Sequence, residues 1–189
     1  MEFEEGKLRS TVQPHILKCR DGDWNHSLRV VSWVKKLGKN RDDLRLIITA
    51  AYLHDVGWKN VLPKGRITLE KLRAYEAEAN NNSEESVTTI LRELKYSINE
   101  ISTVNRLIKS ADSRNPNTVD EKIITDSDNL SKLSIKHLEE KYQISKWKRM
   151  LMLWIKVFPK RIKTAEAKKL YPQLLNNLMK EIEAQNLPM

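Results

Sequence analysis

Residues 42–57 read Asp-Asp-Leu-Arg-Leu-Ile-Ile-Thr-Ala-Ala-Tyr-Leu-His-Asp-Val-Gly, and this stretch decides how the chain folds. Its apolar residues recur at the three- and four-residue spacing of a helix that is buried along one face. Gly57 ends the pattern soon after His54 and Asp55. The stretch therefore predicts an apolar helix with a His-Asp pair at its carboxyl end.

The same periodicity continues through most of the chain, and few residues interrupt it. The 189 residues include only 5 glycines and 6 prolines, and no stretch alternates as a strand does. We expect helices over 24–37, 42–54, 83–95, 97–108, 118–138, 147–158 and 164–182, with Asn82, Ser97, Thr118 and Thr164 as the caps of four of them. Pro172 should kink or split the last helix, and residues 68–79 fit either a short helix or a loop. The predicted fold is all-α, a compact helical bundle with a long C-terminal helix.

Length and composition bound the kind of protein that this chain forms. A length of 189 residues suits a single domain, with a core of about 20–140 and a C-terminal helical extension of about 145–185. The longest apolar runs, at 46–53 and 150–155, are too short to cross a membrane. The acidic amino terminus and the lone Cys19 predict neither a signal peptide nor a disulfide. We therefore expect a cytoplasmic protein.

The chain is strongly basic, with a formal net charge of +9. A positive field attracts anions such as phosphate esters, nucleotides and nucleic acid, but it does not choose among them. Basic residues are dense between 146 and 169, which leaves nucleic-acid binding open. No helix-turn-helix or RNA-binding motif supports that interpretation, and the interleaved Trp147 and Trp154 fit the spacing of a core.

Two of the four histidines fall where the helix pattern brings them together. His26 stands near the start of one predicted helix and His54 near the end of the next, and a short loop between them favours an antiparallel pair. The start of the first helix then lies beside the end of the second, next to Asp55. A second carboxylate comes from Asp126 or Asp128, which interrupt an apolar helical stretch where an aspartate is costly unless paired or bound to metal. Helical geometry allows either aspartate to face inward.

Three segments together resemble a known family. Residues 24–31 (Trp-Asn-His-Ser-Leu-Arg-Val-Val), 50–57 (Ala-Ala-Tyr-Leu-His-Asp-Val-Gly) and 126–130 (Asp-Ser-Asp-Asn-Leu) look like the HD-domain superfamily of metal-dependent phosphohydrolases. Its pattern is a histidine, a His-Asp pair and an aspartate in an acidic-leucine motif. The resemblance extends to a C-terminal helix near residue 180 and implies a helical bundle of the HD-domain type.

The resemblance also implies a ligand set and a reaction. The ligands would be His26, His54, Asp55 and Asp128, because the family's aspartate stands two residues before the leucine; Asp126 would then be a partner of the ligands or an alternative ligand. Such a mixed set suits one divalent transition metal per chain, Mn²⁺, Fe²⁺, Co²⁺, Ni²⁺ or Zn²⁺. The ion would activate a water that attacks a phosphate ester of a nucleotide or related small molecule, with Asp55 orienting the water.

The sequence gives less information about the residues that would bind substrate phosphate or a second metal. Arg29 lies one turn after His26, and Lys59, Lys64 and Arg66 follow the His-Asp pair on a loop that could close over substrate phosphate. Some relatives carry further histidines for a second metal, whereas residues 79–83 and 110–112 contain none. We therefore expect one ion, and the alternative to an enzyme is a module that binds nucleotides with little turnover.

Overall fold

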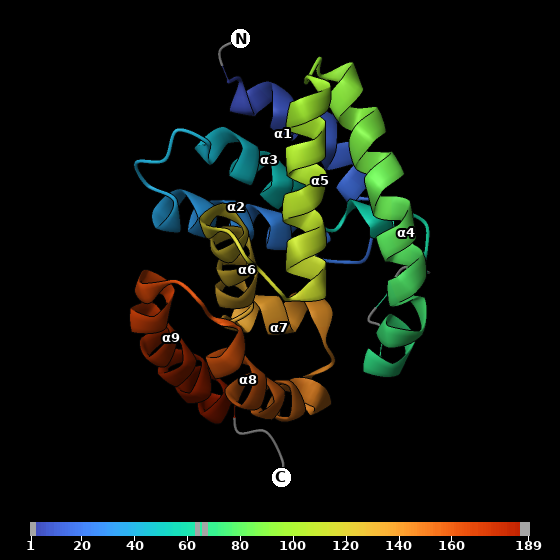
Figure 1. The fold of residues 1–189 in the computed structure, drawn as a ribbon. Helices are drawn as coiled ribbons and strands as arrows, with labels where there is room; N and C mark the ends of the chain where they lie inside the picture. Colours follow the sequence, from blue (N-terminus) through green and yellow to red (C-terminus); the bar gives the residue numbers. More distant parts are fainter. Residues whose placement is uncertain (1–2, 63–64, 66–67, 186–189) are drawn as a thin grey trace.

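The computed structural model describes residues 3–62, 65 and 68–185, and these residues form helices without a strand. The predicted all-α class is therefore confirmed (Figure 1). The helices are α1 (Glu5–Ile16), α2 (Asp23–Leu37), α3 (Leu44–Leu53), α4 (Leu69–Glu93), α5 (Ile98–Ser113), α6 (Val119–Ser131), α7 (Ile135–Lys141), α8 (Trp147–Arg161) and α9 (Ala165–Ala184), with short 3₁₀ turns η1 (Val56–Trp58) and η2 (Ile144–Lys146). Among the described residues, no helix is both long enough and apolar enough to span a membrane.

Helix α2 is the centre of the bundle and packs most extensively against α3 and α6. Its buried face carries Val30 and Val34, which meet Ile47 of α3 and Ile124 of α6 in one apolar cluster. Helices α1 and α5 complete this cluster. The buried residues of α1 are Leu8, Val12 and Ile16, which are spaced four apart. This helical spacing was present in the sequence, although no helix was predicted there.

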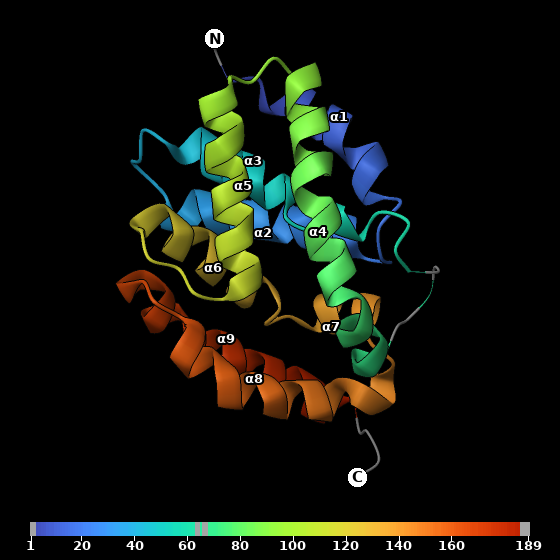
Figure 2. The ribbon, with the colours of Figure 1, turned by 45° about the vertical axis from the view of Figure 1, so that its right-hand side comes forward.

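Helices α8 and α9 pack side by side at one end of the molecule and form a second apolar cluster (Figures 1 and 2). Trp154 and Phe158 of α8 stack at 5.8 Å between ring centroids. The cluster also includes Leu130 of α6 and Leu138 of α7, so the C-terminal helices share buried surface with the helices that precede them.

Three expectations about helix boundaries were wrong. Asn82 does not cap a helix, because α4 runs unbroken from Leu69 to Glu93 and its polar segment contains no glycine or proline. The stretch 118–138 divides instead into α6 and α7, with Ser134 accepting a hydrogen bond from the backbone N–H of His137 as the cap of α7. Helix α9 is not split at Pro172, because contacts of its apolar face with the second cluster on both sides of the proline outweigh the loss of one N–H.

Three predicted caps are confirmed. Ser97 with Glu100 and Thr118 with Glu121 each form a capping box, and Thr164 accepts a hydrogen bond from the N–H of Ala167 at the start of α9. In such a box, two side chains satisfy backbone N–H groups that the first helical turn leaves without partners.

Gly57 holds the end of α3 against α4. A Cβ added at Gly57 would lie 2.1 Å from the carbonyl oxygen of Ala79, so only glycine permits this approach of two backbones. Turn η1, which begins directly after Asp55, packs closely on α4 as a result. The His-Asp pair is thereby fixed at a junction of α2, α4 and α6.

Candidate metal centre

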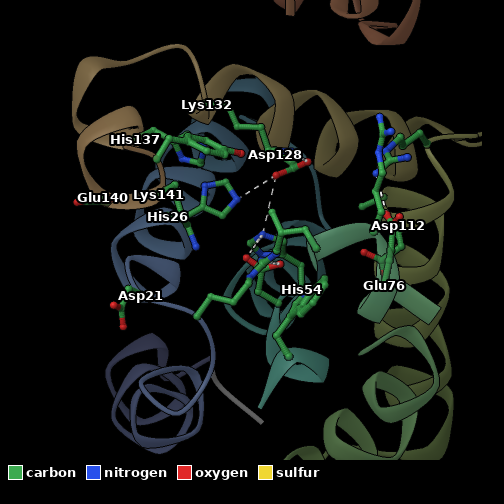
Figure 3. Close-up of a pocket in the computed structure, with 18 of the residues that line it drawn as sticks. Asp21, His26, His54, Glu76, Asp112, Asp128, Lys132, His137, Glu140 and Lys141 are labelled. Carbon is green, nitrogen blue, oxygen red and sulfur yellow. Dashed lines mark hydrogen bonds and ion pairs between the residues drawn. The ribbon is translucent and has the colours of Figure 1, made fainter. Parts of the chain in front are cut away.

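Three side chains from three helices converge at this junction. His26 of α2, His54 after α3 and Asp128 of α6 each offer a ligand atom, and these atoms lie within 4.8 Å of one another. His26 Nε2 is 3.1 Å and His54 Nε2 is 3.9 Å from Asp128 Oδ1 (Figure 3). The antiparallel pairing of α2 and α3 brings the two imidazole rings to 5.0 Å, as the helix pattern predicted.

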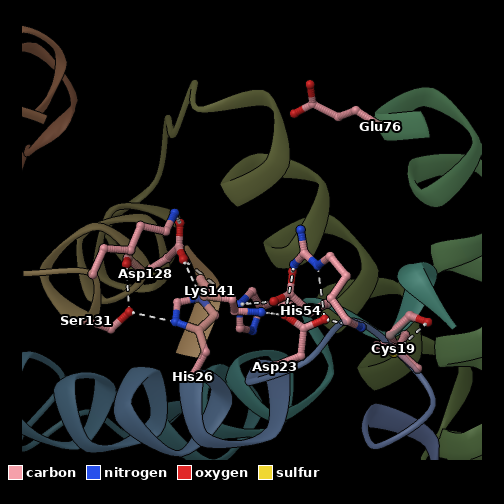
Figure 4. Close-up of polar contacts among 12 residues, drawn as sticks. Cys19, Asp23, His26, His54, Glu76, Asp128, Ser131 and Lys141 are labelled. Carbon is pink, nitrogen blue, oxygen red and sulfur yellow. Dashed lines mark hydrogen bonds and ion pairs between the residues drawn. The ribbon is translucent and has the colours of Figure 1, made fainter. Parts of the chain in front are cut away.

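Hydrogen bonds behind the rings turn both Nε2 lone pairs toward the cluster. His54 Nδ1–H donates to the carbonyl oxygen of Ala51 at 2.8 Å, an atom that can only accept. Ser131 donates its hydroxyl hydrogen to the carbonyl oxygen of Asp128 at 2.8 Å, and therefore accepts from His26 Nδ1–H at 3.1 Å (Figure 4). In these neutral tautomers each Nε2 is an acceptor.

Asp55 lies beside the cluster and is held by a separate ionic network. Its Oδ1 accepts from Arg20 Nη2 at 2.7 Å, and Arg20 also pairs with the fully buried Asp23 at 3.0 Å. Lys141 donates to Asp23 from the opposite side (Figure 4). Burial by itself would raise the pKa of the Asp55 carboxyl, but Arg20, His54 and Lys141 together outweigh it, so that pKa lies below its ordinary value.

The nitrogen and oxygen atoms that face the centre of the cluster suit a cation, because they are hydrogen-bond acceptors and cannot bond to one another. His54 Nε2 and Asp55 Oδ2 are buried, have no hydrogen-bond partner among the described residues and lie 3.5 Å apart. His26 Nε2 and Asp128 Oδ1 are both acceptors in the tautomer that Ser131 sets. A cation would satisfy lone pairs that face each other in this way, and two imidazole nitrogens with one or two carboxylates suit a divalent transition metal.

The charges of the cluster also suit a cation. Burial lowers the pKa of His26 to about 3, so its ring is neutral and free to act as a ligand. Burial would raise the pKa of Asp128, but Lys132 and the two histidines outweigh that effect, and the pKa lies well below its ordinary value. Lys132 contacts Asp128 Oδ2 at 2.5 Å and leaves Oδ1 toward the histidines.

A cavity of about 280 Å³ opens beside the cluster. Its walls bring His26, His54, Asp55 and Asp128 together with groups from other parts of the chain, among them Arg20, Trp58, Glu76, Asp112, Arg114, Lys132, His137, Lys141 and Arg161. The volume suits a small metabolite or a compact nucleotide. Anionic and cationic side chains share its lining, so a bound phosphate would meet both the cluster and positive charge.

Two of the four predicted phosphate-binding cations, Arg29 and Lys59, are not brought to this cavity. Arg29 turns away and contacts Glu140 at 2.7 Å and His137 Nδ1 at 3.4 Å. Lys59 donates to His15 at 3.2 Å and is absent from the cavity wall. Lys64 and Arg66 lie outside the described residues. Arg20, Lys132 and Lys141 are the cations that lie nearest the cluster instead, and Lys132 alone had a sequence signal, being one turn after Asp128.

Asp126 is not brought to the cluster either. Its fully buried carboxylate accepts from the backbone N–H groups of Lys163 and Thr164 at 2.9 and 2.7 Å, and from the Thr164 hydroxyl at 2.7 Å. Because residues two apart on a helix point in nearly opposite directions, Asp126 faces α9 when Asp128 faces the histidines. It ties the start of α9 to α6.

His137 and Asp112 are two lining residues that sequence reasoning missed. The His137 ring lies 5.0 Å from His26, and burial holds its pKa well below the ordinary value. Burial, reinforced by the negative charge of Asp55, raises the pKa of Asp112 to about 7. A histidine in an Ile-Lys-His-Leu segment and an aspartate in a Ser-Ala-Asp-Ser segment carry no local signal, because only the packing of distant helices places them here.

The fold and the cluster agree with the comparison to known families. The HD domain family matches residues 23–133, more than half of the chain, and the chain belongs to that family. Members are generally metal-dependent hydrolases that act on phosphorylated small molecules, and HD domains bind divalent metals. No curated protein and no solved structure gave a match. The matched segment contains all four predicted ligands and ends before α7.

Proposed function

We propose that this protein is a metal-dependent phosphohydrolase that cleaves a phosphate ester of a nucleotide or a related small molecule. The observation that carries the proposal is the convergence of His26, His54 and Asp128, with acceptor atoms turned inward, beside a cavity of metabolite size. Asp55 is the proposed fourth ligand. Membership of the HD domain family supports the class of reaction.

The chain's own residues would divide the work of the reaction. When bound, a divalent ion supplies a Lewis acid that polarises the phosphoryl group and makes water a better nucleophile. Asp55, oriented by Arg20 through Oδ1, keeps Oδ2 available to align the attacking water. Lys132 and Lys141 on the cavity wall offset the negative charge that develops on the phosphoryl oxygens.

The leaving group needs a proton, and Asp112 is the proposed donor. The Asp112 carboxyl lines the cavity and makes no hydrogen bond or ion pair with another described residue. Burial and the negative charges of Asp55 and Asp128 favour its protonated form, against the opposing effects of His54 and Arg114. A carboxylic acid that holds its proton near neutral pH is suited to general acid catalysis.

Asp112→Asn is expected to lower kcat roughly 100-fold for an alkyl phosphate, and far less for p-nitrophenyl phosphate, whose leaving group needs no proton. A general acid acts only while protonated, so wild-type kcat for the alkyl ester should fall as the pH rises through the pKa of Asp112, which burial raises above its ordinary value. The asparagine variant should lose that limb of the profile. Asp21→Asn, at another lining carboxylate, is the matched control. An equal loss for both esters would remove Asp112 from proton transfer.

A panel of nucleoside monophosphates, nucleoside triphosphates, cyclic nucleotides and sugar phosphates, screened with Mn²⁺, Co²⁺, Ni²⁺ and Zn²⁺, tests the proposed function. We expect turnover that chelation abolishes and metal restores, with about one ion per chain by elemental analysis. Turnover that is indifferent to chelation would refute the metal-dependent mechanism.

A second candidate is a nucleotide-binding module with little turnover. The observation in its favour is that Trp58 stands directly after the His-Asp-Val-Gly stretch, where some relatives carry a lysine, so that an auxiliary residue for proton transfer is missing there. Tight nucleotide binding with no hydrolysis of any ester in the same panel would support it over the enzyme.

A further inference from the structure

Arg161 lines the cavity, and its guanidinium N–H groups have no partner among the described side chains. It is the last residue of α8, lies half-buried in the cavity wall, and makes no hydrogen bond or ion pair with a described side chain. Two other cavity arginines are paired, Arg20 with Asp23 and Asp55 and Arg114 with Glu76, and a third, Arg73, is exposed to solvent. Arg161 also comes from outside the segment 23–133 that matches the HD domain family.

The surroundings of Arg161 favour an anion. Burial lowers the pKa of its guanidinium, and the nearby positive charge of Arg114 acts in the same direction. The carboxylate of Glu76 opposes this effect but is paired with Arg114 at 2.9 Å. A guanidinium stays charged at neutral pH, so a desolvated one without a partner gains from a bound carboxylate or phosphate.

Arg161 stands on α8, a helix that carries none of the cluster residues. Glu76 and Asp112 lie on one side of the cavity and His26, His137 and Lys132 on the other, with Asp128 between them (Figure 3). Arg161 lines the same cavity as Glu76 and Arg114, and its guanidinium interacts electrostatically with Arg114, Asp128 and Glu76. A ligand whose phosphate meets the cluster can therefore present a second group to Arg161.

We propose that Arg161 binds a second anionic group of the substrate, so that the preferred substrates are phosphate esters that also carry a carboxylate or a further phosphate. This inference rests on the proposed function for the identity of the first phosphate. The guanidinium can form two parallel hydrogen bonds with either kind of anion, and an ester with no second anionic group would leave it unpaired. The C-terminal helices thereby contribute to substrate choice as well as to the fold.

The test uses binding, so it does not depend on turnover or on metal. Chelator-treated, ¹⁵N-labelled protein is titrated with phenyl phosphate and with the ortho, meta and para carboxyphenyl phosphates, and the Arg161 Nε–H resonance is followed by NMR. We expect the best carboxylated ester to shift this resonance and to bind about five- to tenfold more tightly than phenyl phosphate. Absence of any preference, or a preference that leaves Arg161 unshifted, would overturn the proposal.

Variants distinguish a direct contact between Arg161 and the ligand's carboxylate from a general attraction by the positively charged protein. Arg161→Gln should abolish the preference for the carboxylated ester, and Arg161→Lys, which keeps the charge, should retain part of it and protects the test if the glutamine variant folds poorly. Lys160→Gln removes the same charge from the adjacent exposed position and should leave the preference intact. An equal loss in the Lys160 and Arg161 variants would refute a specific contact. Failure of hydrolysis with the preference intact would contradict only the proposed function.

Discussion

Asp128→Asn is expected to weaken the binding of a divalent transition metal by at least roughly 100-fold. This loss is greater than the one expected on removing a residue that only hydrogen-bonds to a metal ligand. The substitution keeps the size of the side chain but removes the negative charge that faces His26 Nε2 at 3.1 Å and His54 Nε2 at 3.9 Å. Hydrolysis should be lost with the metal. The fold should persist, because Asp128 is only half-buried and the cores are formed by other residues.

Calorimetric titration with Mn²⁺ and Zn²⁺ measures this loss directly, and a melting curve with and without metal checks it independently. Wild-type protein should melt at a higher temperature when metal is added, since an ion that binds only the folded state stabilises it. The Asp128→Asn protein should show no such shift. Full metal affinity in this variant would remove Asp128 from the ligand set.

Asp126→Asn is expected to have the opposite profile: a large loss of stability with metal affinity retained. The Asp126 carboxylate receives two backbone N–H groups and the Thr164 hydroxyl in a fully buried site. An asparagine must direct its NH₂ group at one of these donors, which leaves a buried hydrogen bond unmade. We expect the free energy of unfolding to fall by about 2–3 kcal/mol, and the melting temperature by about 4–12 °C.

The two aspartate variants are matched in chemistry and helix, so each serves as the other's control. Thermal unfolding followed by circular dichroism measures stability, and calorimetry measures metal affinity on the same samples. Asp126→Asn should bind metal within about threefold of wild type, because its side chain contacts the start of α9 and none of the cluster. A larger loss of metal affinity at Asp126 than at Asp128 would reverse the two roles.

Local pattern in the sequence was sufficient for much of the helical fold. The spacing of apolar residues predicted α2 and α3, and the short segment between them predicted that His26 and His54 would approach. Capping residues located the starts of α5, α6 and α9, because each cap binds backbone groups within three residues of itself. Local pattern failed at α4, where polar residues without a glycine or proline did not end the helix.

Tertiary structure alone decided which polar side chains meet. The sequence placed Asp126 and Asp128 on one helix, but the packing of α6 between α2 and α9 determined that Asp128 faces the histidines and Asp126 the start of α9. Arg20 and Arg161 reach one cavity from positions 141 residues apart. The physical reason is range: periodicity and capping act within a few residues, whereas the direction of a polar side chain is set by the helix packed against it.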